Sequence, residues 1–125
     1  KAFTVSMAEA GQVVACDYVG IVSGNKVADK FARAGFHATR SEFVDAPLID
    51  ELSVAMECRL KDYNPETSIL RGEIVNVSVD ERVLGENGKV DASKVVPIIF
   101  DPFNNDYLKV GEKVGNAFSD GKILK

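Results

Sequence analysis

The sequence predicts a mainly β domain with a few short helices, whose main sheet curves as in a barrel. Three observations lead to this class: an alternating strand pattern at residues 3–7, a long hairpin pattern across residues 54–79, and two helical segments that are short. The chain has 125 residues, of which 46% are apolar and 27% charged. This size and composition predict one globular domain, residues 1–125.

The first segments combine one strand with two helices. Residues 3–7 place Phe3, Val5 and Met7 on one face, which predicts a strand that needs a neighbour. Residues 12–19 have mixed helical spacing, and a second helical pattern follows the turn at residues 23–26 and ends at Gly35. Because isolated helices under about 12 residues are marginal in water, we expect both to pack on a sheet.

From residue 39 the pattern becomes β. Residues 42–44 are expected to form a short extended piece, residues 45–47 a turn, and residues 54–61 a half-buried strand. In that strand the apolar residues alternate with a polar row that we expect to face solvent: Glu57, Arg59 and Lys61.

A turn at residues 63–67 leads into a return strand at residues 69–79. Its apolar residues change face partway, because Leu70 and Ile74 follow one alternation and Val75 and Val77 the other. This change predicts a β-bulge near residues 72–75, a feature that curves sheets towards barrels. Closing a barrel also removes the exposed edges of the sheet.

The last part of the chain alternates loops with short elements. After a loop at residues 85–89, Asp91 is expected to cap a short helical turn. Brief apolar pieces follow at residues 97–100 and 107–108, and the tail at residues 120–125 is predicted to be solvated.

Charge, hydropathy and the counts of cysteine and histidine exclude several functions. A net charge of −4 argues against a nucleic-acid partner, and no apolar run is long enough for a membrane span. Cys16, Cys58 and the single histidine, His37, are too few and too widely spaced for a zinc site or a disulfide framework, which favours the cytoplasm. No motif of an activated nucleophile accompanies His37, so we predict no catalytic side chain and no metal site.

The stretch from residue 17 to residue 31 is the strongest candidate for binding. Ser23 and Gly24 lie in a turn with free backbone N–H groups, next to Lys26 and Lys30, and this combination is typical of an anion-binding loop. Turns of the same composition are also common without any ligand.

Five segments together resemble one known family. They are DYVGIVSGNKVADKF, DAPLIDE, MECRLKDY, SILRGEIVNV and FDPFNNDYLKVGEKVGNAF, and in this order they closely resemble the flavin reductase-like, FMN-binding split-barrel family, in particular its flavoredoxin-like branch. The resemblance implies a Greek-key-like split β-barrel and a homodimer with FMN at the interface. It also implies transfer of hydride or electrons from NAD(P)H through FMN. Further strands precede this part in the family, so the domain is expected to lack its N-terminal strands.

The resemblance also implies which residues bind FMN. Lys30 is expected to neutralise the phosphate or the reduced flavin, Phe31 to pack on the ring, and Tyr107 to reach the flavin or the partner subunit. The other expected cofactor-binding residues are Ser23, Gly24, Lys26 and Asp29. As alternatives, Lys30 is a surface lysine, Phe31 a core residue and Tyr107 an interface aromatic.

Two positions depart from the family pattern. Related reductases often carry a histidine, associated with the nicotinamide, in the hairpin turn where this chain has Glu66, and flavoredoxin-like relatives often have a second cysteine where it has Val19. We therefore expect no thiol role for Cys16. The missing histidine keeps one alternative open, an FMN-holding electron carrier reduced by a redox partner protein. A third alternative is a flavin-free barrel with a role in assembly.

Overall fold

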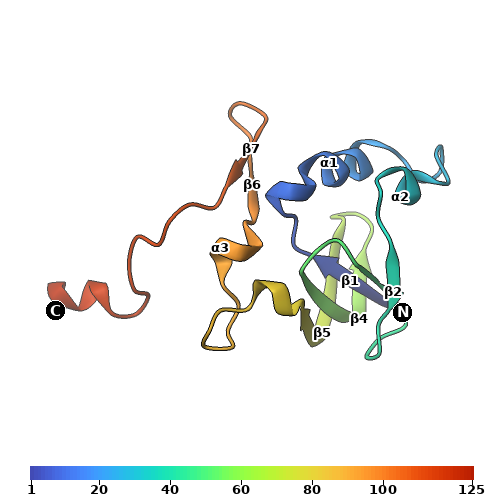
Figure 1. Ribbon diagram of the computed structural model, residues 1–125. Helices are drawn as coiled ribbons and strands as arrows, with labels where there is room; N and C mark the ends of the chain where they lie inside the picture. The colour runs from blue at the N-terminus through green and yellow to red at the C-terminus, as the bar shows by residue number, and fades with distance from the viewer.

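The computed structural model describes residues 1–125 and is built around a three-stranded antiparallel sheet in the order β1–β4–β5 (Figure 1). Two antiparallel hairpins, β2–β3 and β6–β7, accompany it, which confirms the mainly β prediction. The strands are β1 (Ala2–Ser6), β2 (Ala38–Arg40), β3 (Pro47–Ile49), β4 (Val54–Asn64), β5 (Ile69–Val79), β6 (Ile98–Asp101) and β7 (Asp106–Lys109).

The helices are short, as predicted, and no helix in the structure is both long and apolar enough to cross a membrane. Gly35, with φ of 78°, follows α2 and ends it where the sequence predicted. Asp91 caps α3 by accepting the N–H of Ser93. The helical segments are η1 (Ala10–Gln12), α1 (Val13–Ile21), α2 (Lys30–Arg33), η2 (Glu81–Val83), α3 (Ala92–Val95) and η3 (Asp120–Leu124).

The β4–β5 hairpin contains the predicted bulge and a second one. Val75 has no partner on β4, and Lys61 has no partner on β5. Each bulge shifts the alternation of side chains by one residue. Ile74 and Val77 therefore lie on the same face of the sheet, although three positions separate them, and the apolar residues on both sides of the bulge share that face.

The predicted polar face of β4 is wrong at Glu57. Arg59 and Lys61 are exposed, but the side chain of Glu57 has 0% exposure. The reason is that the connection between β2 and β3 lies over this face, where Ser41 donates a hydrogen bond to the Glu57 carboxylate.

The extended piece expected at residues 42–44 is a bend. The hydroxyl oxygen of Ser41 accepts the backbone N–H groups of Phe43 and Val44, each at 3.0 Å. Such local hydrogen bonds from serine compete with strand pairing and turn the chain. The bend connects β2 to β3 instead of extending either strand.

The apolar face of the sheet contains a close contact between β1 and β5. A Cβ atom on Gly72 would lie 2.5 Å from Cζ of Phe3, so the ring occupies the space that any side chain at this position needs. The buried apolar residues are few and come from separate segments: Phe36, Val44, Ala46, Ala55, Cys58, Val83 and Val95. The predicted solvated tail is exposed.

Candidate functional site

Lys30 closes the C-terminal end of α1. Its ammonium group donates hydrogen bonds to the carbonyl oxygens of Val19 and Val22, both at 2.8 Å. These carbonyls belong to the last turn of the helix and to its C-cap, where the helix dipole favours a positive charge. An ammonium has three protons, so one remains for a further acceptor. Lys30 therefore has a structural role and still keeps a donor for an anion.

The turn after α1 offers further donors beside Lys30. The carbonyl of Ser23 accepts the N–H groups of Lys26 and Val27 at 3.0 Å, which fixes the turn. The N–H groups of Ser23 and Gly24 have no acceptor in the chain, and the side chain of Lys26 makes no hydrogen bond or ion pair. A Cβ atom on Gly24 would lie 3.8 Å from Cε of Lys30, so the two positions are adjacent. Lysine side chains and free backbone amides are the donors that commonly bind phosphate groups.

Asp29 and Phe31 make contacts within the chain. The carboxylate of Asp29 accepts from Arg33 at 2.9 Å, and this bond holds the pKa of Asp29 below its usual value. The ring of Phe31 packs against Phe36 with a centroid distance of 5.7 Å and a tilt of 51°. The structure thus shows a surface ion pair at Asp29 and an aromatic contact at the half-buried Phe31.

Tyr107 connects the end of the chain to α1. Its hydroxyl donates to the carboxylate of Asp17 at 2.6 Å, and this bond, followed by burial, raises the pKa of Tyr107. The tyrosine ring packs against Phe100 at a centroid distance of 6.0 Å. At about 1.5 Å per residue, the contacts made by Tyr107 and Lys30 lie less than about 10 Å apart along the axis of α1. The helix thus brings predicted site residues from distant segments together.

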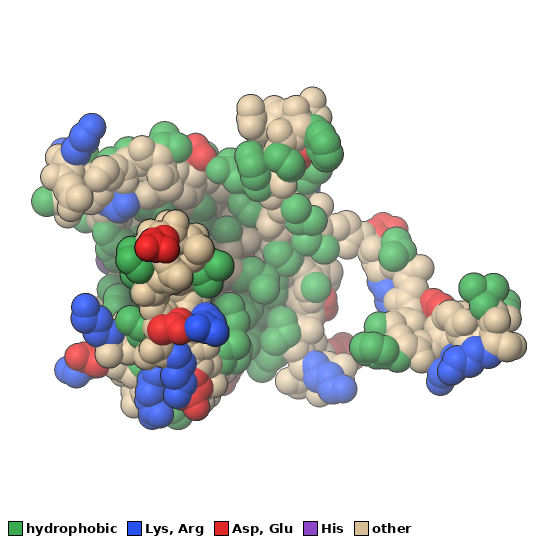
Figure 2. Space-filling view, turned by 180° about the vertical axis from the view of Figure 1, so that it is seen from behind, with side chains coloured by type: hydrophobic (Ala, Val, Ile, Leu, Met, Phe, Trp, Pro, Cys, Tyr) green, Lys and Arg blue, Asp and Glu red, His purple; other side chains and the backbone are tan.

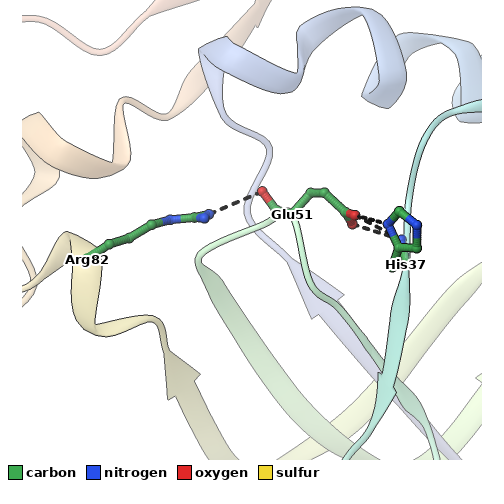
Figure 3. Close-up of polar contacts among 3 residues, drawn as sticks. All are labelled: His37, Glu51 and Arg82. Atoms are coloured by element: carbon green, nitrogen blue, oxygen red, sulfur yellow. Dashed lines mark hydrogen bonds and ion pairs between the residues drawn. The ribbon is translucent and has the colours of Figure 1, made fainter.

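A histidine–glutamate pair was not foreseen from the sequence (Figure 3). The carboxylate of Glu51 accepts from Nδ1 of His37 at 2.5 Å and from the backbone N–H of the same residue at 2.9 Å. The hydrogen bond to Glu51 raises the pKa of His37. Arg82 donates a hydrogen bond to the backbone carbonyl of Glu51 at 3.3 Å. The contacts join the segment before β2, the segment after β3 and η2. Glu51 lies within the DAPLIDE segment quoted above, and this was the only feature of the sequence that pointed to the pair.

The second unforeseen cluster surrounds Glu57. Asn76 donates to its Oε1 at 2.9 Å, Ser78 donates to the same oxygen, and Ser41 donates to Oε2. Burial raises the pKa of Glu57, but the hydrogen bonds from Ser41, Ser78 and Asn76 outweigh it and leave the pKa below its usual value. No cation contacts the carboxylate, so neutral donors alone stabilise this buried charge.

The five main hollows of the surface lie elsewhere than the predicted site. The largest of these five has a volume of about 610 Å³ and is lined by Lys1, Ala2, Phe43, Val44, Asp45 and Arg59, none of which is a predicted cofactor-binding residue. No group of three or more His, Cys, Asp or Glu side chains is placed to hold a metal ion. Cys16 and Cys58 are free thiols, and burial raises the pKa of Cys16.

Comparison with known proteins links this arrangement to flavin-dependent proteins. Residues 1–100 match the family described as the flavin reductase like domain. The flavoredoxin of Desulfovibrio vulgaris (Miyazaki F) is 40% identical, with a TM-score of 0.86, over 94% of this chain and 63% of its own. The flavoredoxin from Methanosarcina acetivorans is 31% identical, with a TM-score of 0.85, over 98% of this chain and 64% of its own.

A third solved structure shows the same fold at low identity. It is an FMN-binding domain of a flavin reductases-like enzyme from Shewanella baltica, 16% identical with a TM-score of 0.76, over 90% of this chain and 62% of its own. The predicted split-barrel fold is confirmed by these matches. The chain spans less than two thirds of the length of each of the three solved proteins.

Proposed function

The chain belongs to the flavin reductase-like family, in its flavoredoxin branch, and from this membership we propose that it is a redox protein whose cofactor is FMN. The observation that carries the proposal is the set of unused donors beside α1: the N–H groups of Ser23 and Gly24, the side chain of Lys26 and the third proton of Lys30. Riboflavin has no phosphate, whereas FMN has one, and these donors are suited to that group.

The aromatic residues of the proposed site would contact the flavin ring. Phe31 follows Lys30 in the chain, and Lys30 and Tyr107 both bond to α1, at Val19 and at Asp17. The half-exposed ring of Tyr107 offers an apolar surface, and its hydrogen bond to Asp17 orients it. Bound flavin supplies hydride and electron transfer, and the protein holds the phosphate and orients the ring.

The assignment of the phosphate is tested by comparing FMN with riboflavin in titrations of the full-length protein. We expect FMN to bind at least tenfold more tightly than riboflavin, because a charged hydrogen bond contributes about 1.5–3 kcal/mol. Lys26→Met should remove most of that difference without changing riboflavin binding. Lys94→Met is the control, since it removes the same charge outside the site; unlike Lys26, Lys94 donates to a carbonyl, that of Leu84.

Two results would contradict the proposal at different levels. Equal affinity for FMN and riboflavin would show that the turn does not bind the phosphate. A protein that binds neither flavin would favour the third alternative, a flavin-free barrel with a role in assembly.

We further propose that NAD(P)H reduces the bound flavin, with the electron carrier as the second candidate. The carrier is favoured by the turn at residues 65–68, where the exposed Glu66 donates its N–H to Asn64 at 2.9 Å and no histidine is present. Anaerobic stopped-flow mixing separates the two. Rapid bleaching of the flavin by NADH or NADPH supports the reductase, whereas bleaching only by a reduced partner protein supports the carrier.

A homodimer with FMN at its interface is part of the proposal, as is a location in the cytoplasm. The proposed site is open: Gly24 and Lys26 are exposed, and a second subunit would complete its walls. The free state of both cysteines is in keeping with a reducing compartment. Light scattering of the FMN-loaded protein would test the dimer, since a monomeric mass with flavin bound would contradict it.

A further inference from the structure

The His37–Glu51 pair lies directly after α2 and holds His37 at three atoms (Figure 3). The backbone N–H of His37 donates to the Glu51 carboxylate at 2.9 Å, and its Nδ1 donates to the same carboxylate at 2.5 Å. The His37 carbonyl accepts the N–H of Asp50 at 2.9 Å. The His37 side chain is 78% exposed, whereas that of Glu51 is 21% exposed. The imidazole can therefore exchange protons with solvent although its partner is mostly covered.

The segment that carries Glu51 is itself held by the body of the protein. Arg82 of η2 donates to the Glu51 carbonyl at 3.3 Å. Ser53, which is 2% exposed, donates its N–H and its hydroxyl to Glu9, and its carbonyl accepts the N–H of Asp80 at 2.8 Å. Because these contacts come from separate segments, the Glu51 carboxylate is a fixed anchor.

Residues 29–36 join His37 to the proposed phosphate site through local hydrogen bonds. The carbonyl of Lys30 accepts the N–H of the C-cap residue of α2 at 3.0 Å, and the carbonyl of Phe31 accepts the N–H of Phe36 at 3.3 Å. The rings of Phe31 and Phe36 are also in contact, and Phe36 is buried. Since these residues form one hydrogen-bonded unit, the position of His37 affects that of Lys30.

The helix α2 depends on such anchors for its position. It has only four residues, too few to be stable alone. The segment from α1 to α2 lies at the edge of the molecule, with Lys and Arg side chains at its surface (Figures 1 and 2). At the start of α2, Lys30 bonds to the carbonyls of Val19 and Val22, and after its end His37 bonds to Glu51. Weakening the second anchor lets α2 move and displaces the ammonium group of Lys30.

The strength of the anchor at His37 depends on charge. His37 is the only histidine of the chain, and histidine normally titrates between pH 5 and 8. The carboxylates of Glu51 and Asp50 face its ring, and the hydrogen bond to Glu51 raises the pKa of His37 above 6.5. Arg82 contacts Glu51 from the side opposite to His37 (Figure 3). A protonated ring makes a charge-assisted hydrogen bond to Glu51, roughly twice as strong as a neutral one.

We propose that protonation of His37 tightens its bond to Glu51, holds α2 and Lys30 in place, and thereby increases the affinity for the flavin phosphate. The proposal rests on the proposed function and adds a response to pH. His37 and Glu51 are positioning residues that act through Lys30. The gain in affinity is full at low pH and is lost as the pH rises through the folded-state pKa of His37.

FMN titrations of the full-length protein between pH 6 and pH 9 test this response. A phosphate monoester loses its second proton at about pH 6, which by itself strengthens binding as the pH rises. The quantity compared is therefore the ratio of the dissociation constant of His37→Gln to that of the original protein, in which the phosphate contribution cancels. We expect a ratio of about three or more at pH 6 and of about one at pH 9. Glu51→Gln should give the same pattern.

The matched control is Asp45→Asn, which breaks another exposed ion pair, with Arg40, at the opposite end of β2. It should leave the dissociation constant unchanged at each pH. A ratio for His37→Gln that does not change with pH overturns the proposal, as does an equal effect of Asp45→Asn.

The pKa of His37, measured by NMR titration with and without FMN, gives the reciprocal measurement. If protonation of His37 favours FMN, then FMN must favour protonated His37 to the same extent. FMN should therefore raise the pKa of His37 in the original protein and leave it unchanged in Glu51→Gln. An equal rise in both proteins would show that the phosphate acts on His37 directly through space, which overturns the role of the anchor.

Amide hydrogen exchange separates this proposal from the flavin proposal, because it requires no cofactor. The protection factors of the Ala34 and Phe36 amides, which hold the α2 unit together, should be higher at pH 6 than at pH 9 in the original protein and independent of pH in His37→Gln. This result without FMN binding would overturn only the flavin proposal. FMN binding with protection that does not depend on His37 would overturn only the anchor.

Discussion

Replacing Glu57 with glutamine should destabilise the protein although the two side chains have nearly the same shape. The hydroxyl oxygen of Ser41 already accepts the N–H groups of Phe43 and Val44, so its one proton must go to Glu57. A glutamine whose amide nitrogen faces Ser41 places an N–H donor against the Ser41 hydroxyl, which is itself a donor. In the flipped orientation the amide faces Asn76, which is also a donor. Neither orientation satisfies all the partners.

The expected loss follows from the number of hydrogen bonds. Glu57→Gln removes at least one bond to a charged group and leaves a buried donor unpaired, which costs about 1.5–3 kcal/mol. With a typical slope for a small domain, this shifts the urea midpoint down by about 1 M. Glu57→Ala removes both acceptor oxygens, and with them all three hydrogen bonds, and should cost at least about twice as much. Glu73→Gln, on the exposed neighbouring strand, is the matched control and should leave the midpoint unchanged.

The pH dependence gives a separate test of the same reasoning. The folded-state pKa of Glu57 lies below its usual value of 4.5, so its stabilising contribution is present above 4.5. That contribution is lost as the pH falls through the folded-state pKa. Urea unfolding at several pH values should show this acid-dependent loss in the original protein and less of it in Glu57→Gln. Equal stability of the two proteins, with the same pH dependence, would refute the assigned network.

Two further substitutions test other contacts. Gly72→Ala should lower the free energy of unfolding by about 1–3 kcal/mol, because its Cβ would overlap the ring of Phe3. A smaller residue at position 3 should recover part of that loss. Gly111→Ala, with open space around it, is the control in the same unfolding assay. Glu51→Gln should lower the pKa of His37, measured by NMR titration, towards 6.5. Because folding raises this pKa, the pair stabilises the protein fully below pH 6.5, and this stabilisation is lost as the pH rises through the folded-state pKa. If Glu51→Gln leaves the titration of His37 unchanged, the pair does not form.

Local signals in the sequence were sufficient for much of the fold. The end of α2 at Gly35 and the cap at Asp91 depend on single residues whose conformation or side chain decides the outcome. The bulge at Val75 was predictable because the apolar residues of β5 change their alternation there. The second bulge, at Lys61, occurs among polar residues of β4, where no change of apolar alternation marks it.

The burial of Glu57 depends on tertiary contacts that no local pattern records. A glutamate in an alternating strand is typical of a solvent-facing row, and here Ser41, Asn76 and Ser78 approach it from two other segments. The candidate site shows the same limit. The donors of residues 23–30 were found because they are contiguous, whereas the contact of Lys30 with the end of α1 required the folded chain.

The two bulges make the hairpin tolerant of changes in length at two defined places. Outside them, every residue of β4 that pairs with β5 has a fixed partner, and deleting one such residue would move all the side chains beyond it to the opposite face. Deleting Val75 or Lys61 leaves every existing pair intact, because neither residue has a partner. Single-residue insertions and deletions in related sequences should therefore concentrate at these two positions, where the chain can lengthen or shorten without repacking the sheet.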